Sequence, residues 1–417
     1  MKDLPAMDER LAEHAAAHRA DVIRFATELI RTPSLSGDEE AVATLVAAEM
    51  RRLGYDDVFT DAVGNVVGVL HGTGQGPSIL FCSHMDTAEP GDPELWERSP
   101  YEVAEIDGAL CGLGASDSKG ALAAQVYGAA LLKHQGLALS GDVMVAGVVM
   151  AERAEGFGIA HLFDVTLPER GLKPAFVVMG DPTGLDVFLG QRGRLELEVV
   201  TIGRTSHASA PWLGVNAAYK MVPVIEGVHE LASTLPSHPF LEKSTIALTN
   251  LACTPARYSI IPDRCIASLD RRYLPSESLD TIIMQVQSLI NRVADKDPEF
   301  KGEARVRTVA ETAYTGVTKE VPKLLTPFVT SEKHPLVARA VGALEALGHS
   351  PNFDKWYFST EGGYVASVVG LPTIGYAPGE EKVSHTPYDR VRIDHLMTCV
   401  AGSAAIARAI AADKTRE

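Results

Sequence analysis

A histidine and an aspartate, His84 and Asp86, stand two positions apart at the end of a short apolar run that begins at Ser78. Alternate residues of a strand point to the same face, so these two side chains are expected to lie together. One of them can bind a metal ion while the other fixes the orientation of the ring. A second carboxylate, Asp117, lies in a Gly-rich turn before an expected helix at 118–134, where a metal could approach the backbone closely. Together these features predict a metal site.

Three further polar residues follow apolar runs or Gly-rich loops. Expected strands at 142–150 and 175–179 lead into two carboxylates, and a histidine follows a Gly-rich loop near the C-terminus. Strand ends at one edge of an open α/β sheet converge on one crevice. Converging carboxylates without a cation would repel one another and take up protons, so the cluster implies metal. The expected ligands are His84, Asp117, Glu152, Asp181 and His385.

This mixture of imidazoles and carboxylates suits Zn²⁺, Mn²⁺ or Co²⁺. Five ligands suffice for two divalent ions only if one carboxylate bridges them. A single Asp or Glu at a strand end is more often a helix cap or a solvated charge, and lone histidines are usually structural. The argument for metal therefore depends on all five residues occurring together.

The composition excludes several classes of protein. The chain has 417 residues, 46% of them hydrophobic, and a net charge of −16. The length predicts two or three domains, and the negative charge argues against nucleic-acid or anionic-membrane partners. The five cysteines are scattered without a Cys-x-x-Cys motif, so we expect a reducing compartment. With no apolar signal core and no apolar run of about 18 residues, the expected location is the cytoplasm.

Apolar periodicity predicts an α/β fold with an inserted module. Helical spacing at 20–31, 38–53 and 335–347, with strand-like runs at 65–70, 78–82, 142–150 and 175–179, indicates an α/β sheet with helices on both faces. From 194 to 309 the order strand, helix, strand, strand, helix, strand predicts a compact ferredoxin-like module. We therefore expect a catalytic metal-binding domain made of residues 1–191 and 310–417, interrupted by a second domain at 192–309.

Nearly the full length of the chain resembles the dinuclear zinc hydrolases related to acetylornithine deacetylase, succinyl-diaminopimelate desuccinylase and aminoacylase, together with related peptidases. The matching motifs lie at 83–87, 112–120, 205–209, 261–263, 270–272, 378–379 and 385–389. The resemblance implies that Asp117 bridges two ions. One ion would also take His84 and Asp181, and the other Glu152 and His385. Asp86 would orient His84, and the inserted module would act as lid and dimerisation domain.

Three matched positions imply contacts with a small-molecule substrate that bears a carboxylate. His207 would reach into the active site of a partner subunit and stabilise an oxyanion through a ring N–H. Arg272 would hold the substrate carboxylate with its planar fork. Gly379 would leave room for the substrate and offer a backbone N–H. The expected assembly is a homodimer or a higher homo-oligomer.

The chain departs from this family at Ala151, where two adjacent glutamates are usual, the first a general base and the second a ligand. Here Glu152 keeps the ligand position, because the alternative register would place Arg153 there and a guanidinium cannot bind a cation. A general base contributes roughly 10²–10⁴ in rate. We expect a variant inactivated by replacement of Glu with Ala; alternatively Glu155 supplies the base, or the chain is a natural binding protein. A second departure is Ser259, where relatives often have Asn.

The expected activity is hydrolysis of a C–N bond by metal-activated water, in an N-acyl amino acid or a small peptide. One alternative is an aminohydrolase that releases ammonia from an aromatic amine such as nitroanthranilate, with Trp212 and the aromatic run 356–358 as flat walls. Another is a catalytically inactive metal- or ligand-binding relative, which Ala151 alone supports. The aromatic residues are also compatible with an ordinary core.

Overall fold

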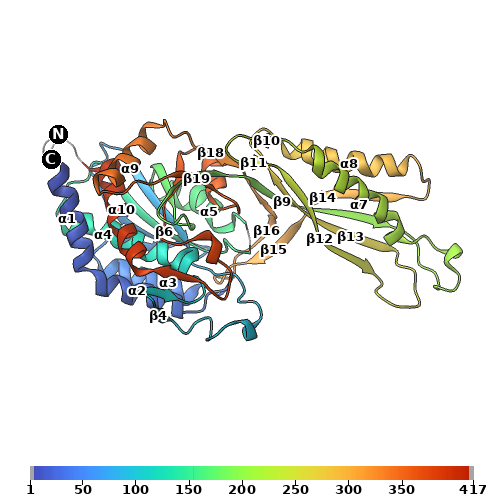
Figure 1. Cartoon of the computed structure of the whole chain (residues 1–417), viewed down its shortest axis with the longest axis horizontal. Coiled ribbons are helices and arrows are strands. Elements are labelled where there is room, and N and C mark those ends of the chain that lie inside the picture. The colour runs from blue at the N-terminus through green and yellow to red at the C-terminus, as the bar shows by residue number, and fades with distance from the viewer. Residues whose placement is uncertain (1–3, 154, 413–417) are drawn as a thin grey trace.

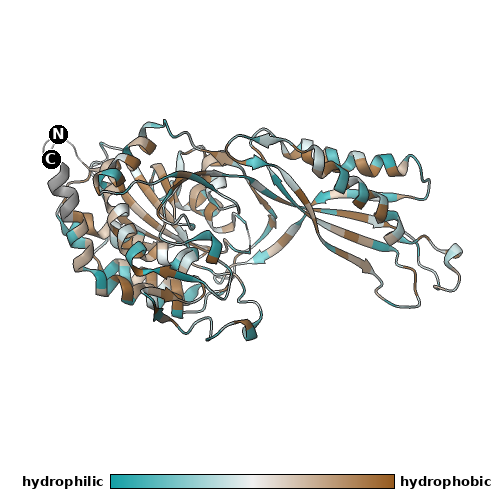
Figure 2. Ribbon diagram, in the orientation of Figure 1, coloured by the Kyte–Doolittle hydropathy of each residue, from teal (hydrophilic) through white to brown (hydrophobic). Residues whose placement is uncertain are grey.

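The computed structural model describes residues 4–153 and 155–412. It is an elongated molecule in which a larger lobe holds both the first and the last helix, and a narrower lobe extends to one side (Figure 1). Apolar residues gather on the strands of the larger lobe and on the helix faces that cover them (Figure 2). The two lobes are therefore built around separate sheets.

The larger lobe contains a nine-stranded mixed sheet. Its central strands β6, β3, β7 and β20 are parallel neighbours. Across the sheet the order is β1 (Asp57–Thr60), β2 (Val66–Leu70), β6 (Val143–Val148), β3 (Ser78–His84), β7 (Pro174–Met179), β20 (Thr373–Gly375), β8 (Val187–Gln191) and β18 (Phe328–Val329), with β19 (Phe353–Trp356) paired to β8. The strands predicted at 65–70, 78–82, 142–150 and 175–179 are confirmed as β2, β3, β6 and β7.

Helices cover both faces of this sheet, as predicted. Alternate strand residues enter different apolar clusters: Phe81 and Val145 face one, while Leu80 and Met144 face the other. The first cluster is formed with α1 (Leu4–Ala17), α2 (Arg19–Arg31), α3 (Glu40–Arg52), α4 (Gly120–His134), α9 (Pro335–Ala346) and α10 (Ile393–Ala411). The second is formed with the short helices α5 (Phe157–His161) and α6 (Leu167–Glu169) and the turns beside them.

The narrower lobe is a four-stranded antiparallel sheet in the order β12-β13-β9-β14, extended by β17 (Leu324–Leu325), which pairs with β9. Its core lies under two helices, and strand β13 alternates buried and half-buried residues along its whole length. The elements are β9 (Gly193–Ile202), α7 (Ala217–Thr234), β12 (Thr245–Thr254), β13 (Arg264–Tyr273), α8 (Leu279–Ala294) and β14 (Lys301–Val306). This is the predicted ferredoxin-like order, with an additional hairpin of β10 (Ser237–His238) and β11 (Glu242–Lys243) after α7.

Helix α10 is, by length and composition alone, apolar enough to cross a membrane. In the folded chain it packs against α4 and α9, and 72% of its most apolar window is buried. Burial inside the larger lobe accounts for its composition. This helix was not predicted from the sequence.

The contact between α4 and α10 depends on a glycine. A Cβ on Gly128 would lie 2.7 Å from Cβ of Ser403 and 2.8 Å from the carbonyl oxygen of Val400. We predict that Gly128→Ala lowers the free energy of unfolding by about 1–2 kcal/mol, because overpacking outweighs the helix propensity of alanine. Gly342→Ala in α9 is the matched control: nothing lies within 4 Å of its Cβ position, so it should be neutral or stabilising. Urea unfolding measures both, and equal effects of the two changes would contradict this account.

Candidate metal centre

The predicted metal ligands lie at the carboxyl ends of parallel strands. His84 is the last residue of β3, and Glu152 and Asp181 follow the ends of the neighbouring strands β6 and β7. Asp117 comes from a tight turn, η2 (Ala115–Lys119), that leads into α4. His385 follows the short helix η6 (Glu381–Val383) and has φ of 57°, a left-handed conformation that is unusual outside glycine.

These five side chains form two triads that share one carboxylate. In one triad, ligand atoms of His84, Asp117 and Asp181 lie within 4.8 Å of one another. In the other, the same holds for Asp117, Glu152 and His385. Nε2 of His84 is 2.9 Å from Oδ1 of Asp117, and Nε2 of His385 is 3.4 Å from its Oδ2. Asp117 thus presents one oxygen to each triad.

The carboxylates and imidazoles of the cluster shift one another's pKa values. Hydrogen bonds to Asp117 and Glu152 raise the pKa of His385 to about 10. Burial, followed by the nearby carboxylate of Asp117, raises the pKa of Asp181 to about 7. Burial also disfavours the ionised form of Asp117, but hydrogen bonds from His385 and His84 hold its pKa well below the usual range. Such a donor set has the chemistry of a cation site, because a cation would relieve the repulsion among the carboxylates.

The tautomer of His84 is fixed by the main-chain carbonyl group of Asp86. Nδ1 lies 2.9 Å from the carbonyl oxygen of Asp86, which can only accept, so Nδ1 carries the proton. In the neutral ring, Nε2 therefore keeps its lone pair and faces Asp117 and Asp181. The carboxylate of Asp86 lies farther from Nδ1, at 3.6 Å. Asp86 orients His84 mainly through its main chain.

The fully buried carboxylate of Asp86 holds a different part of the site. It accepts hydrogen bonds from the backbone N–H of Ala151 at 3.2 Å and of Glu152 at 2.9 Å, and from the hydroxyl of Ser36 at 2.6 Å. Burial opposes ionisation of Asp86, but the interaction with His84 and these donors keep its pKa below the usual value. Asp86 therefore fixes the segment that carries Glu152.

The two residues before this segment are held in the same way. Val149 N–H donates to Oδ1 of the buried Asn65 at 3.0 Å, and Met150 N–H donates to Oε1 of the buried Glu39 at 2.9 Å. Met150 itself has φ of 64°, and this left-handed residue turns the chain out of strand β6. Four successive N–H groups beyond the strand are thus satisfied by side chains from other elements.

The turn of Asp117 is held by a carboxylate that sequence reasoning left without a role. Asp389 is buried and accepts hydrogen bonds from the N–H groups of Gly114 at 2.6 Å and Ser116 at 2.8 Å. Because Asp389 lies four positions after His385, this contact ties the C-terminal loop to the Asp117 turn. The sequence signal was present, since Asp389 ends the motif that begins at His385.

The triads open into a cleft of about 980 Å³ between the two lobes. Ala151 lines this cleft, so the position of the expected general base carries no carboxylate. Glu155 also lines it, but its oxygens lie 2.7 Å from Nη1 of Arg194 and 3.2 Å from Nζ of Lys323. Those two ion pairs hold Glu155 against cations of the cleft wall.

Of the predicted substrate residues, Arg272 lies in the cleft wall. Its Nε is 2.7 Å from Oδ1 of Asp270, and Nη1 donates to the hydroxyl of Ser359 at 3.1 Å. Gly379 does not line the cleft: a Cβ there would lie 2.1 Å from the carbonyl oxygen of Ser116. Gly379 allows the backbone to pack closely against the Asp117 turn. The absence of a side chain does not leave free space for a substrate there, as had been expected.

His207 is not brought to the metal centre of its own chain. It is exposed in the loop between β9 and α7, which lies at the far end of the narrower lobe (Figure 1). The residues predicted to form aromatic walls do not lie together. Trp212 is 76% exposed in the same loop, and Trp356 is buried in the core of the larger lobe. Of the run 356–358, Phe358 lines the cleft.

Glu361 was missed by sequence reasoning. It is buried, it lines the cleft, and its Oε1 has no hydrogen-bond partner. Burial, with the nearby carboxylate of Asp86, raises its pKa to about 8, so it is largely neutral at pH 7. Nothing in the sequence distinguishes Glu361 from a solvated glutamate in a Gly-rich loop.

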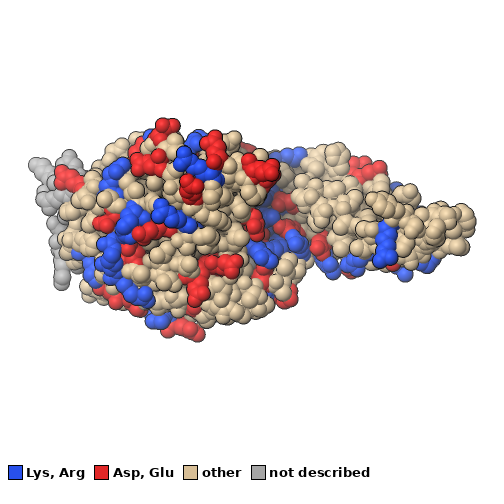
Figure 3. Space-filling view, turned by 90° about the horizontal axis from the view of Figure 1, so that it is seen from below, with Lys and Arg blue, Asp and Glu red and all other residues tan. Residues whose placement is uncertain are grey.

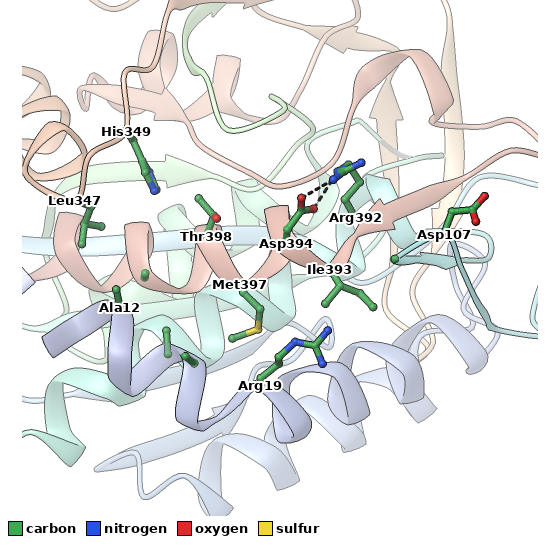
Figure 4. Close-up of a pocket in the computed structure, with 14 residues that line it drawn as sticks. Ala12, Arg19, Asp107, Leu347, His349, Arg392, Ile393, Asp394, Met397 and Thr398 are labelled. Atoms are coloured by element: carbon green, nitrogen blue, oxygen red, sulfur yellow. Dashed lines mark hydrogen bonds and ion pairs between the residues drawn. The ribbon is translucent and has the colours of Figure 1, made fainter. Parts of the chain in front are cut away.

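A smaller cavity of about 490 Å³ lies elsewhere, between α1, the start of α10 and the loop after α9 (Figure 4). Its polar residues include Arg19, His349 and Arg392, and Arg392 is paired with Asp394. It contains none of the predicted ligands or substrate residues. The larger cleft is therefore the candidate active site.

The clamp made by Asp86 leads to a test. We predict that Asp86→Ala lowers the free energy of unfolding by about 2–4 kcal/mol, because it leaves the half-buried N–H groups of residues 151 and 152 without their acceptor. Ser36→Ala removes a single donor to the same carboxylate and should cost about 1 kcal/mol. Denaturant unfolding measures both variants. An Asp86→Ala variant as stable as Ser36→Ala would show that the clamp contributes little.

Known proteins resemble this chain over most of its length. Residues 80–409 match the model of peptidase family M20/M25/M40. The uncharacterised protein YgeY of Escherichia coli K12 is 32% identical over 95% of this chain and 96% of its own length. An N-formyl-4-amino-5-aminomethyl-2-methylpyrimidine deformylase of Bacillus subtilis is 25% identical over 93% of this chain and 94% of its own length.

Solved structures share the fold. Aminopeptidase PepT of Bacillus cereus has a TM-score of 0.71 with 20% identity, covering 94% of this chain and 98% of its own. The YxeP protein of Bacillus subtilis, described as a dinuclear metal-binding peptidase, has a TM-score of 0.69 with 13% identity over 94% of this chain and 98% of its own. The resemblance inferred from the motifs is confirmed: the chain belongs to the peptidase family M20/M25/M40, a family of hydrolases that act on amide or peptide bonds.

Proposed function

We propose that this protein is a dinuclear metal-dependent hydrolase whose substrate is an N-acyl amino acid or a small peptide with a free carboxylate. The observation that carries the proposal is that Asp117 offers one oxygen to each of two ligand triads. Asp117 would bridge the ions, with His84 and Asp181 on one and Glu152 and His385 on the other. Two divalent ions, Zn²⁺ or Mn²⁺ or Co²⁺, would activate a water and polarise the carbonyl under attack.

The chain's own residues supply positioning for this reaction. His84 is held as the tautomer that leaves Nε2 free, and Asp86 fixes the backbone that presents Glu152. Arg272 would receive the substrate carboxylate in place of its present contact with Asp270. Gly379 would contribute at most a backbone N–H, because its Cβ position is occupied by Ser116.

The aromatic-amine alternative has weaker support. Trp356 is buried and donates its indole N–H to the carbonyl oxygen of Pro182, so it forms no wall of the cleft. The N-acyl or peptide substrate is therefore the proposal that we favour. Residues 1–191 and 310–417 would form the catalytic unit, and residues 192–309 the lid and dimerisation unit.

The first prediction of this proposal concerns the binding of metal ions. Without ions, His385 has a pKa of about 10 and the pKa of His84 is also raised, so both rings are protonated at pH 7. Metal binding needs neutral rings, so loading two ions should release on the order of two protons, and affinity should rise with pH. Titration calorimetry in two buffers of different ionisation enthalpy measures this release.

Asp117→Asn should lose at least one ion, whereas Asp394→Asn, which removes a surface carboxylate paired with Arg392, should keep both. Absence of stoichiometric Zn²⁺ or Mn²⁺ after reconstitution would overturn the proposed metal centre.

The second prediction concerns the missing base. Ala151→Glu should raise kcat by about 10²–10⁴, because a carboxylate then faces the attacking water. Metal content and KM should change little, since Asp86 holds this segment by its N–H groups. Ala151→Gln is the matched control, having the same shape without a base, and should not raise kcat. If the unaltered chain already turns over at the rate of Ala151→Glu, another group supplies the base.

The third prediction concerns assembly through residues 192–309. Exposed apolar side chains, including Tyr219, Val222, Leu248 and Leu251, lie on α7 and on the edge strand β12. Charged side chains are sparse at the end of this lobe in Figure 3. We expect a dimer by sedimentation, in which His207 serves the partner's site.

A mixing experiment tests the role of His207. In the Ala151→Glu background, His207→Ala and Asp117→Asn should each be inactive alone. Mixed dimers would combine an intact metal centre with an intact His207 and regain activity. A monomer, or a mixture without regained activity, would contradict the assembly and the role of His207.

A further inference from the structure

Two of the five cysteines face each other across a strand pair. Cys253 on β12 and Cys265 on β13 are direct partners in the antiparallel register. Their Sγ atoms are 3.2 Å apart, and both are free thiols. Cys253 is half-buried and packs against the apolar cluster of the narrower lobe, to which the buried Cys265 belongs. The geometry brings together two thiols that the scattered spacing of cysteines in the sequence does not suggest.

The segment between these cysteines supports the loop that carries His207. His207 forms an isolated β-bridge with Ile260. The N–H of Ala208 donates to the carbonyl oxygen of Ser259, and the N–H of Ile261 donates to that of Ser206, both at 2.9 Å. The ladder of β12 and β13 ends one pair beyond the cysteines, at Thr254 and Arg264. The two cysteines therefore stand at the base of the hairpin loop on which the His207 loop rests.

We propose that Cys253 and Cys265 are an oxidation site, which hydrogen peroxide converts into a reversible intrachain disulfide that stiffens the His207 loop. Cys253 is the more accessible thiol and reacts first: its sulfur attacks the O–O bond, giving a sulfenic acid and one water. The sulfur of Cys265 then displaces the sulfenic oxygen as a second water. Two thiols and one peroxide thus yield one disulfide and two waters.

The accessibility of the two thiols sets this order. Burial, with the adjacent Cys253, raises the pKa of Cys265 to about 12, so Cys265 is a poor first nucleophile. Once Cys253 is oxidised, Cys265 is already in contact with it. A disulfide at this position would join β12 to β13 beside the hairpin loop. It would therefore restrict separation of the two strands at that end of the sheet.

The link to catalysis rests on the proposed role of His207, whereas formation of the disulfide does not. The first measurement therefore detects formation of the disulfide and does not depend on enzymatic activity. Folded, metal-loaded protein is treated with hydrogen peroxide, blocked with N-ethylmaleimide and digested with trypsin without reductant. Trypsin cuts after Arg257 and Arg264, so the two cysteines leave in separate peptides that only a disulfide can join.

The expected product is one linked pair of peptides that dithiothreitol separates. Cys265→Ser should abolish it, and Cys111→Ser, which removes a half-buried cysteine on β5 (Ala109–Cys111), should not. Recovery of both residues as blocked thiols, or of Cys253 linked to a second chain, would overturn the proposal.

Hydrogen exchange tests the effect on the loop. Oxidation should slow exchange at 204–209 and 254–264 by at least severalfold, and Cys265→Ser should remove that difference. A disulfide that forms without any change of exchange would retain the modification site and refute its coupling to the His207 loop. Failure of His207→Ala to affect turnover would instead concern the proposed function alone.

Discussion

The carboxylate of Asp86 is the constraint on which the metal centre depends. Three parallel strands end at the same edge of the sheet, and beyond β6 the N–H groups of residues 149–152 are bonded to side chains instead of to a neighbouring strand. Asp86 takes up the N–H groups of Ala151 and Glu152, while its own carbonyl fixes the tautomer of His84. One buried residue thus joins the end of β3 to the end of β6. Without the carboxylate, two of the four N–H groups that fix residues 149–152 would lose their acceptor.

Other buried carboxylates fix backbone segments around the site in the same way. Glu39 holds Met150, and Asp389 holds the turn of Asp117, so both of these segments are anchored by an acidic side chain that accepts backbone N–H groups. Burial raises the pKa of Glu39 to about 7 and that of Asp389 to about 7, and the nearby carboxylates of Asp86 and Asp117 respectively add to the rise. A carboxylate accepts from two donors at once, which a neutral acceptor of the same size does less well. A candidate cation site that is organised from loops in this way therefore contains several buried carboxylates besides the candidate ligands.

The sequence was sufficient to predict the main features of the fold, because its signals were local. Apolar runs such as 78–82 and the helical spacing at 20–31 depend on neighbours within one element, and the order of elements at 194–309 indicated the ferredoxin-like sheet. The five candidate ligands could be picked out because each follows a strand or a Gly-rich turn, and the structure brings them together in two triads. What could not be predicted depends on contacts between distant segments. The packing of Gly379 against Ser116, the burial of Glu361 and the opposition of Cys253 to Cys265 have no local signature. The location of His207 far from its own metal centre likewise requires the three-dimensional structure.

These contacts also explain how position 151 can carry alanine in an otherwise intact site. Asp86 and Glu39 hold residues 150–152 through main-chain N–H groups, which every residue except proline possesses. The side chain at 151 projects into the cleft and takes no part in those bonds. A side chain at position 151 could therefore differ between alanine and glutamate without moving the backbone that carries Glu152. The hydrogen bonds that hold Glu152 are thus independent of the side chain at position 151, so under the proposed function a change at this position would act on the general base and not on the arrangement of the candidate ligands.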